Sequence, residues 1–383
     1  MRIAFYAPLK PPDHPVPSGD RRMAQLLQLA LTRAGHEVEL AARLRSYDGA
    51  GDVEQQRRLA EIGGKLATRL VEQFRARPQD ERPRAWLTYH LYYKAPDWIG
   101  PRVAAQLGIP YLVAEASVAM KRAGGPWSLS HEAVLAALRR ADAVISLNPV
   151  DDESVLPHLR DRSRLHRLKP FLDAAPFFDA QRPHSHATRP AVAQRFALDP
   201  EIPWFVTAAM MRPGDKLASY RILGEALASL LGQSWQLLVI GDGPARRDVE
   251  AALAPLGERV RYAGMLPPDA MPETLAAADL FVWPAINEAY GMAILEAQAA
   301  GLPVVAGRSG GVASLVADGQ SGVLVPAGDA AAFAAALASL VEDDGRLHMY
   351  AACALSKVLS EHDIGAAGAA LDAILAAVTK VGA

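Results

Sequence analysis

The regular alternation of short apolar runs with helical stretches is the feature that most limits how this chain can fold. Runs such as RIAFYAP near the start and WFVTAAM in the middle have the composition of buried strands, and each is followed by a stretch of helical periodicity. Strands that alternate with helices form βαβ units and parallel sheets. The pattern therefore predicts an α/β protein with doubly wound sheets.

The alternation is interrupted once, which divides the chain into two predicted domains. The 383 residues are too many for one core, since a domain typically has about 100–200 residues. Residues 173–190 are rich in proline, histidine and polar residues and have no period, so they are predicted to form the linker. We expect an N-terminal domain over residues 1–180 and a C-terminal domain over residues 190–363. The final helix, residues 364–383, has a pattern that would pack on either domain.

Charge and hydropathy exclude two classes of protein. The formal net charge is −2, without the basic surplus of nucleic-acid-binding proteins, so no nucleic acid partner is expected. No stretch approaches the roughly 18 consecutive apolar residues that a membrane span needs, and the start of the chain has the pattern of a strand and a loop rather than of a signal peptide. These patterns predict a cytoplasmic protein and leave open a peripheral contact at the inner membrane surface.

Loops beyond the carboxyl ends of the strands are the candidate site, because doubly wound sheets bind their ligands there. In the second domain these loops are predicted at residues 212–216, 241–244, 264–268 and 284–291. Arg212 and Lys216 suit a diphosphate, since arginine forks to paired oxygens and lysine adds a point charge. The alternative is a pair of solvated surface charges.

A glycine-rich turn follows the predicted strand WQLLVI. Gly241 and Gly243, with Asp242 between them, let the backbone turn tightly and approach a ligand closely. The third glycine of the dinucleotide fingerprint is missing, because Arg246 occupies its position. The segment is therefore either a ligand loop or a plain tight turn.

Two glutamates, Glu288 and Glu296, flank the predicted start of a helix at Gly291. Free backbone N–H groups at residues 290–293 and the helix dipole favour an anion at this end. The two carboxylates do not suit a phosphate, but they accept hydrogen bonds from sugar hydroxyls. A surface helix with two solvated acids explains the spacing poorly, because Glu296 lies in MAILEAQAAG, where a buried face is expected.

The pattern E-x7-E formed by Glu288 and Glu296, taken with its neighbours, resembles the retaining glycosyltransferases of the GT-B fold, family 4 in particular. The resemblance extends through VIGDGP, RVRYAGMLPPDAMPETLAAADLFVWP, EAQAAGLPVVAGRSGG and DGQSGVLVPAGDAAAFAAAL, which is most of the second domain. In the first domain it rests on RIAFYAP and the loop PVPSGD and is weaker. It implies two Rossmann-like domains that face each other across a cleft, with the final helix, residues 364–378, packed on the N-terminal domain.

The resemblance also implies a role for individual residues. Arg212 and Lys216 would hold the diphosphate of a nucleotide sugar. Glu288 would contact the hydroxyls of its sugar, and Glu296 those of its ribose. The remaining expected donor contacts are the backbone at Met265 and Leu266 for the base, Gly19 of the first domain for the phosphates, and Gly241, Asp242, Gly243, Tyr290, Gly291, Met292 and Ala293.

No cofactor and no metal are expected. Sugar-transferring enzymes of the other common fold hold a metal with an Asp-x-Asp pair, and this chain has no two aspartates separated by one residue. The acidic runs at residues 151–153 and 342–344 are expected to lie away from the site loops. Arg212, Lys216 and a helix N-terminus would stabilise the departing phosphate instead.

The chain departs from the family's usual pattern at several positions. Ala285 stands where the family often has serine and Ser314 where it often has glutamate, and the phosphate loop reads MMRPGDKL. A histidine is common near the end of the strand YLVAEAS, where this chain offers Glu115 and Ser117. These changes leave the acceptor side and the catalytic group open.

The candidates in the first domain lie at or just beyond predicted strand ends. They are His90, Glu115, Lys121 and Asn148, with His90 and Glu115 as the candidate catalytic groups. A structural role is the alternative for a lone histidine such as His90. The helix at residues 53–77 carries six cations and three acids, which is typical either of a solvated face or of the membrane contact of family members with lipid acceptors.

The sequence thus predicts a retaining glycosyltransferase that moves a sugar from a nucleotide sugar to an unidentified acceptor and releases a nucleoside diphosphate. The acceptor would be a glycan, a lipid-linked molecule or a small molecule, in polysaccharide or glycoconjugate biosynthesis. Two alternatives stay open. One is a sugar-nucleotide epimerase of the same fold, although those enzymes lack this E-x7-E context. The other is a non-catalytic sugar-nucleotide-binding protein that has lost its acceptor chemistry.

Overall fold

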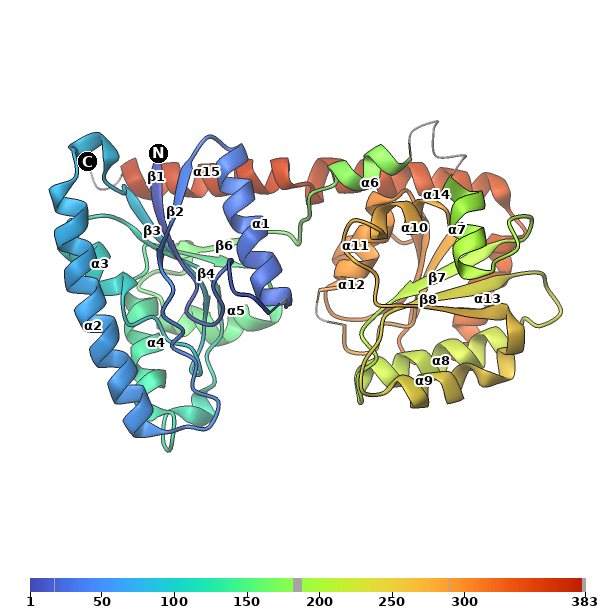
Figure 1. The fold of residues 1–383 in the computed structure, drawn as a ribbon, viewed down its shortest axis with the longest axis horizontal. Helices are drawn as coiled ribbons and strands as arrows, with labels where there is room; N and C mark the ends of the chain where they lie inside the picture. Colours follow the sequence, from blue (N-terminus) through green and yellow to red (C-terminus); the bar gives the residue numbers. More distant parts are fainter. Residues whose placement is uncertain (17, 182–187, 289, 381–383) are drawn as a thin grey trace. The chain divides into compact units, whose positions relative to one another are not determined.

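The chain forms two compact α/β units. The computed structural model describes residues 1–16, 18–181, 188–288 and 290–380. One unit contains Met1–Lys169 together with helix α15 (Ile364–Lys380), and the other contains Pro170–Asp363 (Figure 1). Parts of four predicted segments lie outside the described residues: 17 of the loop PVPSGD, 182–187 of the linker, 289 between the two glutamates, and 381–383 of the final helix.

The first unit is built on a six-stranded parallel sheet in the order β2-β1-β3-β4-β5-β6. The order runs outward from β1 to β2 on one side and through β3 on the other, so the topological switch point lies between β1 and β3. Its strands are β1 (Arg2–Tyr6), β2 (Glu37–Ala42), β3 (Ala85–Leu91), β4 (Tyr111–Ala116), β5 (Ala143–Ser146) and β6 (Leu165–Arg167). Its α-helices before α15 are α1 (Gly19–Arg33), α2 (Val53–Ala76), α3 (Gly100–Leu107), α4 (Ser128–Arg140) and α5 (Pro149–Val155).

The second unit has a six-stranded parallel sheet in the order β12-β11-β10-β7-β8-β9. This is the Rossmann order, with its switch point between β7 and β10. Its strands are β7 (Trp204–Ala208), β8 (Gln236–Ile240), β9 (Val260–Gly264), β10 (Leu280–Trp283), β11 (Val304–Arg308) and β12 (Gly322–Pro326). Its α-helices are α6 (Ala175–Ala180), α7 (Thr188–Phe196), α8 (Asp215–Ala228), α9 (Arg246–Leu253), α10 (Met271–Ala276), α11 (Met292–Ala299), α12 (Val312–Leu315), α13 (Ala330–Val341) and α14 (Asp344–Lys357).

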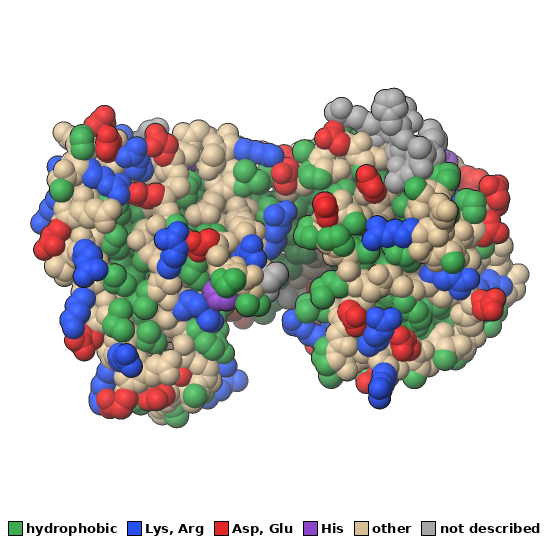
Figure 2. Space-filling model, viewed as in Figure 1, with side chains coloured by type: hydrophobic (Ala, Val, Ile, Leu, Met, Phe, Trp, Pro, Cys, Tyr) green, Lys and Arg blue, Asp and Glu red, His purple; other side chains and the backbone are tan. Residues whose placement is uncertain are grey.

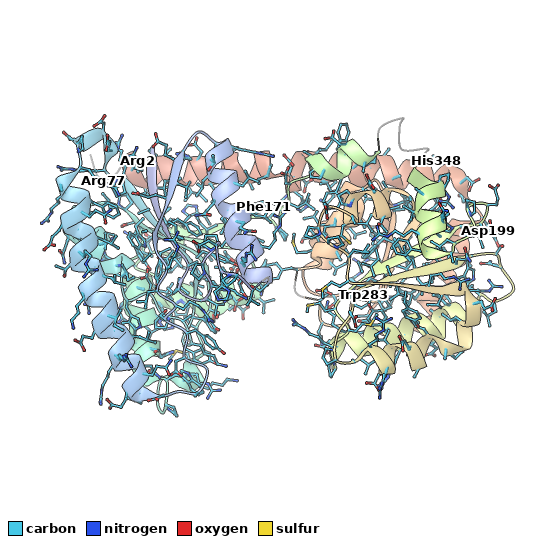
Figure 3. The ribbon with its side chains drawn as sticks, viewed as in Figure 1. Arg2, Arg77, Phe171, Asp199, Trp283 and His348 are labelled. Atoms are coloured by element: carbon cyan, nitrogen blue, oxygen red, sulfur yellow. The ribbon has the colours of Figure 1, made fainter. Side chains whose placement is uncertain are left out.

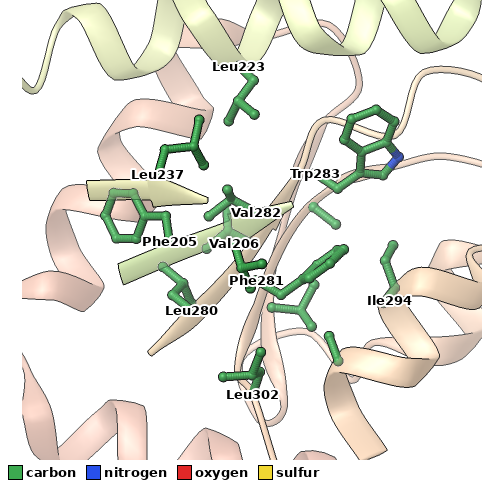
Figure 4. Packing of buried hydrophobic residues seen from close by; sticks show 14 of the residues in the cluster. Phe205, Val206, Leu223, Leu237, Leu280, Phe281, Val282, Trp283, Ile294 and Leu302 are labelled. Carbon is green, nitrogen blue, oxygen red and sulfur yellow. The ribbon is translucent and has the colours of Figure 1, made fainter. Parts of the chain in front are cut away.

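The central strands of the second unit are buried on both faces. β7 and β10 read WFVTA and LFVW, the continuous apolar runs expected of parallel strands covered by helices on either side. Figure 4 shows Phe205 and Val206 of β7 packed with Phe281 and Val282 of β10, and Leu223 of α8 directed toward them. All five side chains are fully or almost fully buried. The loops at the carboxyl ends of these strands therefore start from a rigid platform.

Helix α1 begins and ends at the residues that the sequence predicts. The Ser18 side chain accepts a hydrogen bond from the Arg21 N–H at 3.2 Å, and Gly35, just past the helix, has a φ of +85°. Helix α15 packs along α1, where Gly368 lies so close that an added Cβ would be 2.7 Å from the carbonyl oxygen of Ala30. The final helix therefore belongs to the first unit.

The boundary between the units differs from the predicted one. It falls between Lys169 and Pro170, so residues 170–180 belong to the second unit rather than to the N-terminal domain. Phe177 of α6 is buried, and the Gln181 side-chain amide donates to the carbonyl oxygen of Ala299 in α11 at 2.7 Å. The predicted linker is also partly helical, because α6 and the start of α7 lie within residues 173–190.

The basic helix α2 uses its apolar side within the first unit. Ala67, Leu70, Val71 and Phe74 are buried, while its cations lie on the opposite, exposed side. Throughout the part of the chain that the structure describes, no helix has the length and hydropathy to cross a bilayer.

Candidate functional site

The predicted donor residues gather at the switch point of the second unit. The loops after β7 and β10 leave neighbouring strands and turn to opposite sides of the sheet, which opens space beyond the strand ends. Lys216 lies in the first turn of α8, after β7, and Glu288 lies in the loop after β10. These two residues are 72 positions apart in sequence and meet only because β7 and β10 are adjacent.

The centre of this site is an ion pair stacked against an indole ring. Lys216 Nζ lies 2.5 Å from Glu288 Oε2, and the Trp283 indole N–H donates to the same oxygen at 3.1 Å. The ammonium also lies 5.3 Å from the centroid of the Trp283 ring. Figure 3 labels Trp283, which is the last residue of the central strand β10. The Glu288 side chain is only 15% exposed. Its orientation is fixed by two donors, Lys216 of α8 and Trp283 of β10.

The loop that carries Glu288 is strained and tied down. Ala285 and Asn287 have φ values of +56° and +47°, a conformation that non-glycine residues rarely adopt. The Ile286 N–H donates to Ser219 Oγ at 3.0 Å, and the Asn287 amide donates to Asp215 at 3.1 Å. Helix α8 therefore holds this loop, and strain of this kind is typical of functional sites.

Helix α11 begins where the sequence predicts, with Gly291 at its N-cap at a φ of +71°. The backbone N–H groups of Met292 and Ala293 have no acceptor among the described residues, as expected at a helix start. Tyr290 is half-buried just before this end. Glu296 is half-buried in the second turn of the helix, rather than solvated on an exposed face.

The glycine-rich turn after β8 touches the loop after β7. A Cβ at Gly241 would lie 2.0 Å from the carbonyl oxygen of Ala209, and one at Gly243 would lie 2.3 Å from that of Met211. The two glycines are therefore needed for the loops after β7 and β8 to pack closely, whether or not a ligand also binds there. The Asp242 carboxylate is already engaged, because it accepts from the Gly243 N–H at 2.7 Å and from Arg246 at 3.1 Å.

The other predicted donor residues of this unit lie at the same edge of the sheet. Arg212 is exposed in the loop after β7, and its guanidinium has no ion-pair partner within the described ranges. Met265 is 78% exposed directly after β9, while Leu266 packs against the core. The structure therefore brings Arg212 and Met265 to the surface at the carboxyl edge, available for a ligand.

In the first unit, His90 lies in a group of carboxylates. Its Nδ1 is 2.9 Å from Asp20 Oδ1 in the first turn of α1. Burial of the ring by itself lowers the pKa of His90, but the hydrogen bond to Asp20 and the charges of Glu115 and Asp151 outweigh it and raise the pKa overall. The same hydrogen bond lowers the pKa of Asp20. His90 and Glu115 both have left-handed backbone, with φ of +64° and +59°.

Asp151, from the acidic run at residues 151–153, lies near a candidate of the first unit, His90. Asp151 starts α5 after β5, at the same edge of the sheet as His90, and its charge acts on the imidazole. The sequence did not predict strand order, and the order of β3, β4 and β5 is what brings the acid near.

The remaining candidates of the first unit have simpler surroundings. Asn148 caps α5 by accepting from the Val150 N–H at 3.2 Å and donates to Asp151 at 3.0 Å, which is a structural role. Lys121 is exposed in the loop after β4. Gly19 begins α1, and a Cβ there would meet nothing within 4 Å.

Three residues of these sites were missed by the sequence reasoning: Asp20, Trp283 and Ser309. Asp20 lies at the start of a predicted helix, and Trp283 lies at the carboxyl end of a predicted strand. Both positions are at the edge of a sheet where ligands bind, so the sequence could have indicated both residues. Ser309 Oγ accepts from the Glu288 N–H at 3.1 Å, a contact across two loops with no local signal. No group of three or more His, Cys, Asp or Glu side chains arranged to hold a metal occurs in the described part of the chain.

Comparison with known proteins finds a family model that matches most of the second unit. Residues 203–343 match the family model described as glycosyl transferases group 1. The chain is 30% identical over 265 residues to 2-deoxystreptamine glucosyltransferase of Streptomyces kanamyceticus, covering 64% of each chain. It is 45% identical over 87 residues to D-inositol 3-phosphate glycosyltransferase of Corynebacterium kroppenstedtii, covering 23% of this chain and 19% of the relative. The chain thus matches less than two thirds of the length of these curated relatives.

Solved structures share the fold over nearly the whole chain. A glycosyltransferase from Rickettsia africae superposes with a TM-score of 0.75 at 14% identity, covering 99% of this chain and 98% of its own. HepE of Anabaena, solved in complex with UDP, superposes with a TM-score of 0.70 at 17% identity, covering 98% and 100%. At these identities the likeness concerns the fold alone, and it confirms the predicted GT-B type with two Rossmann-like domains.

Proposed function

We propose that this chain, whose residues 203–343 match the family model of glycosyl transferases group 1, is a retaining glycosyltransferase that uses a nucleotide sugar. The observation that carries the proposal is the pairing of Lys216 with Glu288 beside Trp283 at the Rossmann switch point. A cation for a phosphate and a carboxylate for sugar hydroxyls stand there side by side. A nucleotide-sugar site needs both groups at the bond between the sugar and the diphosphate, one to bind the phosphate and one to bind the sugar.

The donor would lie across the carboxyl edge of the second unit. Its diphosphate would meet Lys216, the unpaired Arg212 and the free N–H groups of Met292 and Ala293. Its sugar would bind Glu288 and its ribose Glu296, while the base would lie near Met265 and Leu266. HepE has been solved with UDP, so UDP-sugars are the first donors to test.

In the proposed reaction the bond between the sugar's anomeric carbon and the diphosphate breaks, and a bond to an acceptor oxygen forms on the same face. The proton of the acceptor hydroxyl passes to the departing phosphate oxygen, and a nucleoside diphosphate leaves. Lys216, Arg212 and the start of α11 would stabilise the charge that develops on that phosphate. His90, held by Asp20, and Glu115 are the candidate groups for orienting the acceptor.

Release of nucleoside diphosphate from a panel of UDP-, GDP- and TDP-sugars tests this function. The first acceptors to try are cyclic polyols, because two relatives are named for D-inositol 3-phosphate and for 2-deoxystreptamine. The product's anomeric configuration, read by NMR, should match that of the donor. Isomerisation of the donor without transfer would indicate the epimerase alternative, and tight nucleotide binding without turnover would indicate the binding-protein alternative.

Transfer is expected to need no divalent metal, because positive charge at the diphosphate would come from Lys216 and Arg212. Rates measured in excess EDTA should equal those with added magnesium. Loss of activity in EDTA that magnesium or manganese restores would overturn both the metal-free reaction and the phosphate role of these two residues.

A further inference from the structure

A continuous row of rings extends from His90 along the carboxyl edge of the first unit. The ring centroids of His90 and Tyr92 are 5.0 Å apart, those of Tyr92 and Tyr93 5.6 Å, and those of Tyr93 and Trp127 5.6 Å. Tyr92, Tyr93 and Trp127 are half-buried, so each of these rings keeps an exposed part. The row comes from two loops, one after β3 and one after β4, and it begins at the proposed acceptor group.

Two cations lie over the far end of this row. The Arg122 guanidinium is 4.6 Å from the Trp127 ring centroid and 5.5 Å from that of Tyr93. Lys94 Nζ is 5.8 Å from both. We name Tyr92, Tyr93, Lys94, Arg122 and Trp127 the aromatic–cationic patch.

The two cations of the patch have no carboxylate partner among the described residues, in contrast to Arg2, Arg77 and Arg140 of the same unit. Arg122 Nε is buried and has no hydrogen-bond acceptor. Basic and acidic side chains otherwise alternate over the face of the first unit shown in Figure 2. Among the described residues of this unit, Arg58 and Arg102 also lack an ion-pair partner, so the distinguishing feature of the patch is that its two cations lie over aromatic rings.

Two acids near the patch, Asp48 and Asp20, already have hydrogen-bond partners of their own. Asp48 is buried and accepts from the Ala50 and Gly51 N–H groups at 3.0 and 2.9 Å and from Gln56 at 2.7 Å. Asp20 is bound to His90 at the other end of the row. Burial raises the pKa of Tyr92, so its hydroxyl keeps its proton and remains a donor.

We propose that the aromatic–cationic patch is an acceptor subsite for a ring compound that carries a phosphate or carboxylate group. The inference rests on the proposed transferase function, and it further predicts that the acceptor is negatively charged. The aromatic faces would contact the apolar face of the ring, and the fork of Arg122 with Lys94 would bind the anion. A neutral acceptor would gain only the ring contact, and an amino sugar would be repelled.

Three sugars with one ring and different charges test the subsite: glucose 6-phosphate, glucose and glucosamine. Their binding is measured by calorimetry with UDP at saturating concentration, so that the donor site is occupied. The wild-type protein should bind glucose 6-phosphate at least tenfold more tightly than either of the others, and 0.5 M NaCl should weaken that preference.

Variants of Lys94 and Arg122 test whether glucose 6-phosphate binds at the patch. The double variant Lys94→Gln/Arg122→Gln should bind glucose 6-phosphate at least tenfold more weakly. Arg122→Lys, which keeps the charge but loses the fork, should fall between it and the wild type. Arg58→Gln is the control, because Arg58 is an exposed cation of α2 in the same unit and lies outside the patch. An unchanged circular dichroism spectrum and an unchanged melting temperature of the double variant show that the fold is intact.

Equal affinity for the three sugars, or a preference for the phosphate that survives in the double variant, would overturn the subsite. A wild-type protein that binds no nucleotide but keeps the patch-dependent preference would count against the proposed transferase function and not against the subsite. The two proposals therefore fail separately.

Discussion

Lys216 and Glu288 bind each other, and a donor would compete for both. The diphosphate would draw on the ammonium and the sugar hydroxyls on the carboxylate, so the ion pair would be exchanged for ligand contacts. Because both side chains are partly buried, neither has bulk water as a ready substitute. Substitutions of the two residues should therefore have different effects on nucleotide affinity.

Glu288→Gln should leave UDP affinity at least as high as in the wild type, because Lys216 loses a competing carboxylate. Transfer should fall by about 10²–10³-fold, the scale for a lost preorganised hydrogen-bonding group. Calorimetry with UDP and a transfer assay measure the two effects. Lys216→Ala is the counterpart and should weaken both binding and transfer. Full activity in Glu288→Gln would remove Glu288 from the sugar site.

Glu296→Ala should weaken UDP affinity and leave the rate at saturating donor nearly unchanged, since a ribose contact is made equally in the ground and transition states. Glu296→Gln, which keeps the size of a half-buried side chain, is the control for packing. If both variants bind UDP as tightly as the wild type, the ribose assignment is wrong.

Asp20→Asn should lower the pKa of His90, because the hydrogen bond and the charge of Asp20 both favour the imidazolium. The raised pKa of His90 stabilises the fold fully below about pH 6.5, the unfolded value, and this contribution is lost as pH rises through the folded pKa. The lowered pKa of Asp20 contributes above about pH 3.9 and is lost as pH falls through its folded value.

The pair is therefore most stabilising between roughly pH 4 and pH 6.5. An NMR titration of the imidazole resonances measures the change, with His90→Gln used for assignment. His166, whose pKa is lowered by burial in another part of the unit, is the internal control. A His90 pKa that does not move in Asp20→Asn would mean that the contact is not formed in solution.

At the scale of elements, the two glycines after β8 fix how closely two loops pack. Gly241→Ala should destabilise the second unit by about 1–3 kcal/mol, the usual cost of overpacking, because the new methyl group would lie 2.0 Å from the Ala209 carbonyl oxygen at a φ of +133°. Thermal unfolding followed by circular dichroism measures it. Gly232→Ala is the matched control, since a Cβ there meets nothing within 4 Å. Equal melting temperatures for the two variants would contradict the close approach.

The sequence predicted most strands but not their order. Long apolar runs such as WFVTA and LFVW are distinctive because central parallel strands are buried on both faces. The short outer strands β6 and β12 were missed, since LHR has little apolar pattern and GVLVP reads as part of a loop. The Lys216–Glu288 and His90–Asp20 contacts join residues 72 and 70 positions apart. They depend on which strands are neighbours, and periodicity carries no information about that.

At the scale of the whole molecule, the chain crosses between the units at two places that lie together. Leu172 and Asp363 form a backbone bridge, and the Leu172 N–H donates to the His362 carbonyl oxygen at 3.0 Å. The proline-rich composition of residues 173–190 suggested a linker there, whereas the actual crossing at Lys169–Pro170 is short. Residues 170–180 belong to the second unit because they pack against it, as the burial of Phe177 illustrates, and composition does not predict such packing.

Gly368→Val should loosen the first unit and leave the second unchanged, because the new side chain would push α15 away from the Ala30 carbonyl oxygen. Hydrogen exchange by mass spectrometry should rise in α1 and α15 and stay constant in β7 to β12. Ala369→Val, at an exposed position of the same helix, controls for the lower helix propensity of valine. Similar exchange in the two variants would show that the contact of α1 with α15 is not tight.

The position of α15 has a consequence for how the protein is made. Domains usually fold in the order in which the ribosome delivers them. Here the segment Pro170–Asp363 is complete while α1 still lacks the helix that covers it. The second unit can therefore finish folding on the ribosome before the unit whose synthesis began first. Until Ile364 and the residues after it emerge, a nascent chain would have to keep the apolar side of α1 from associating with other molecules.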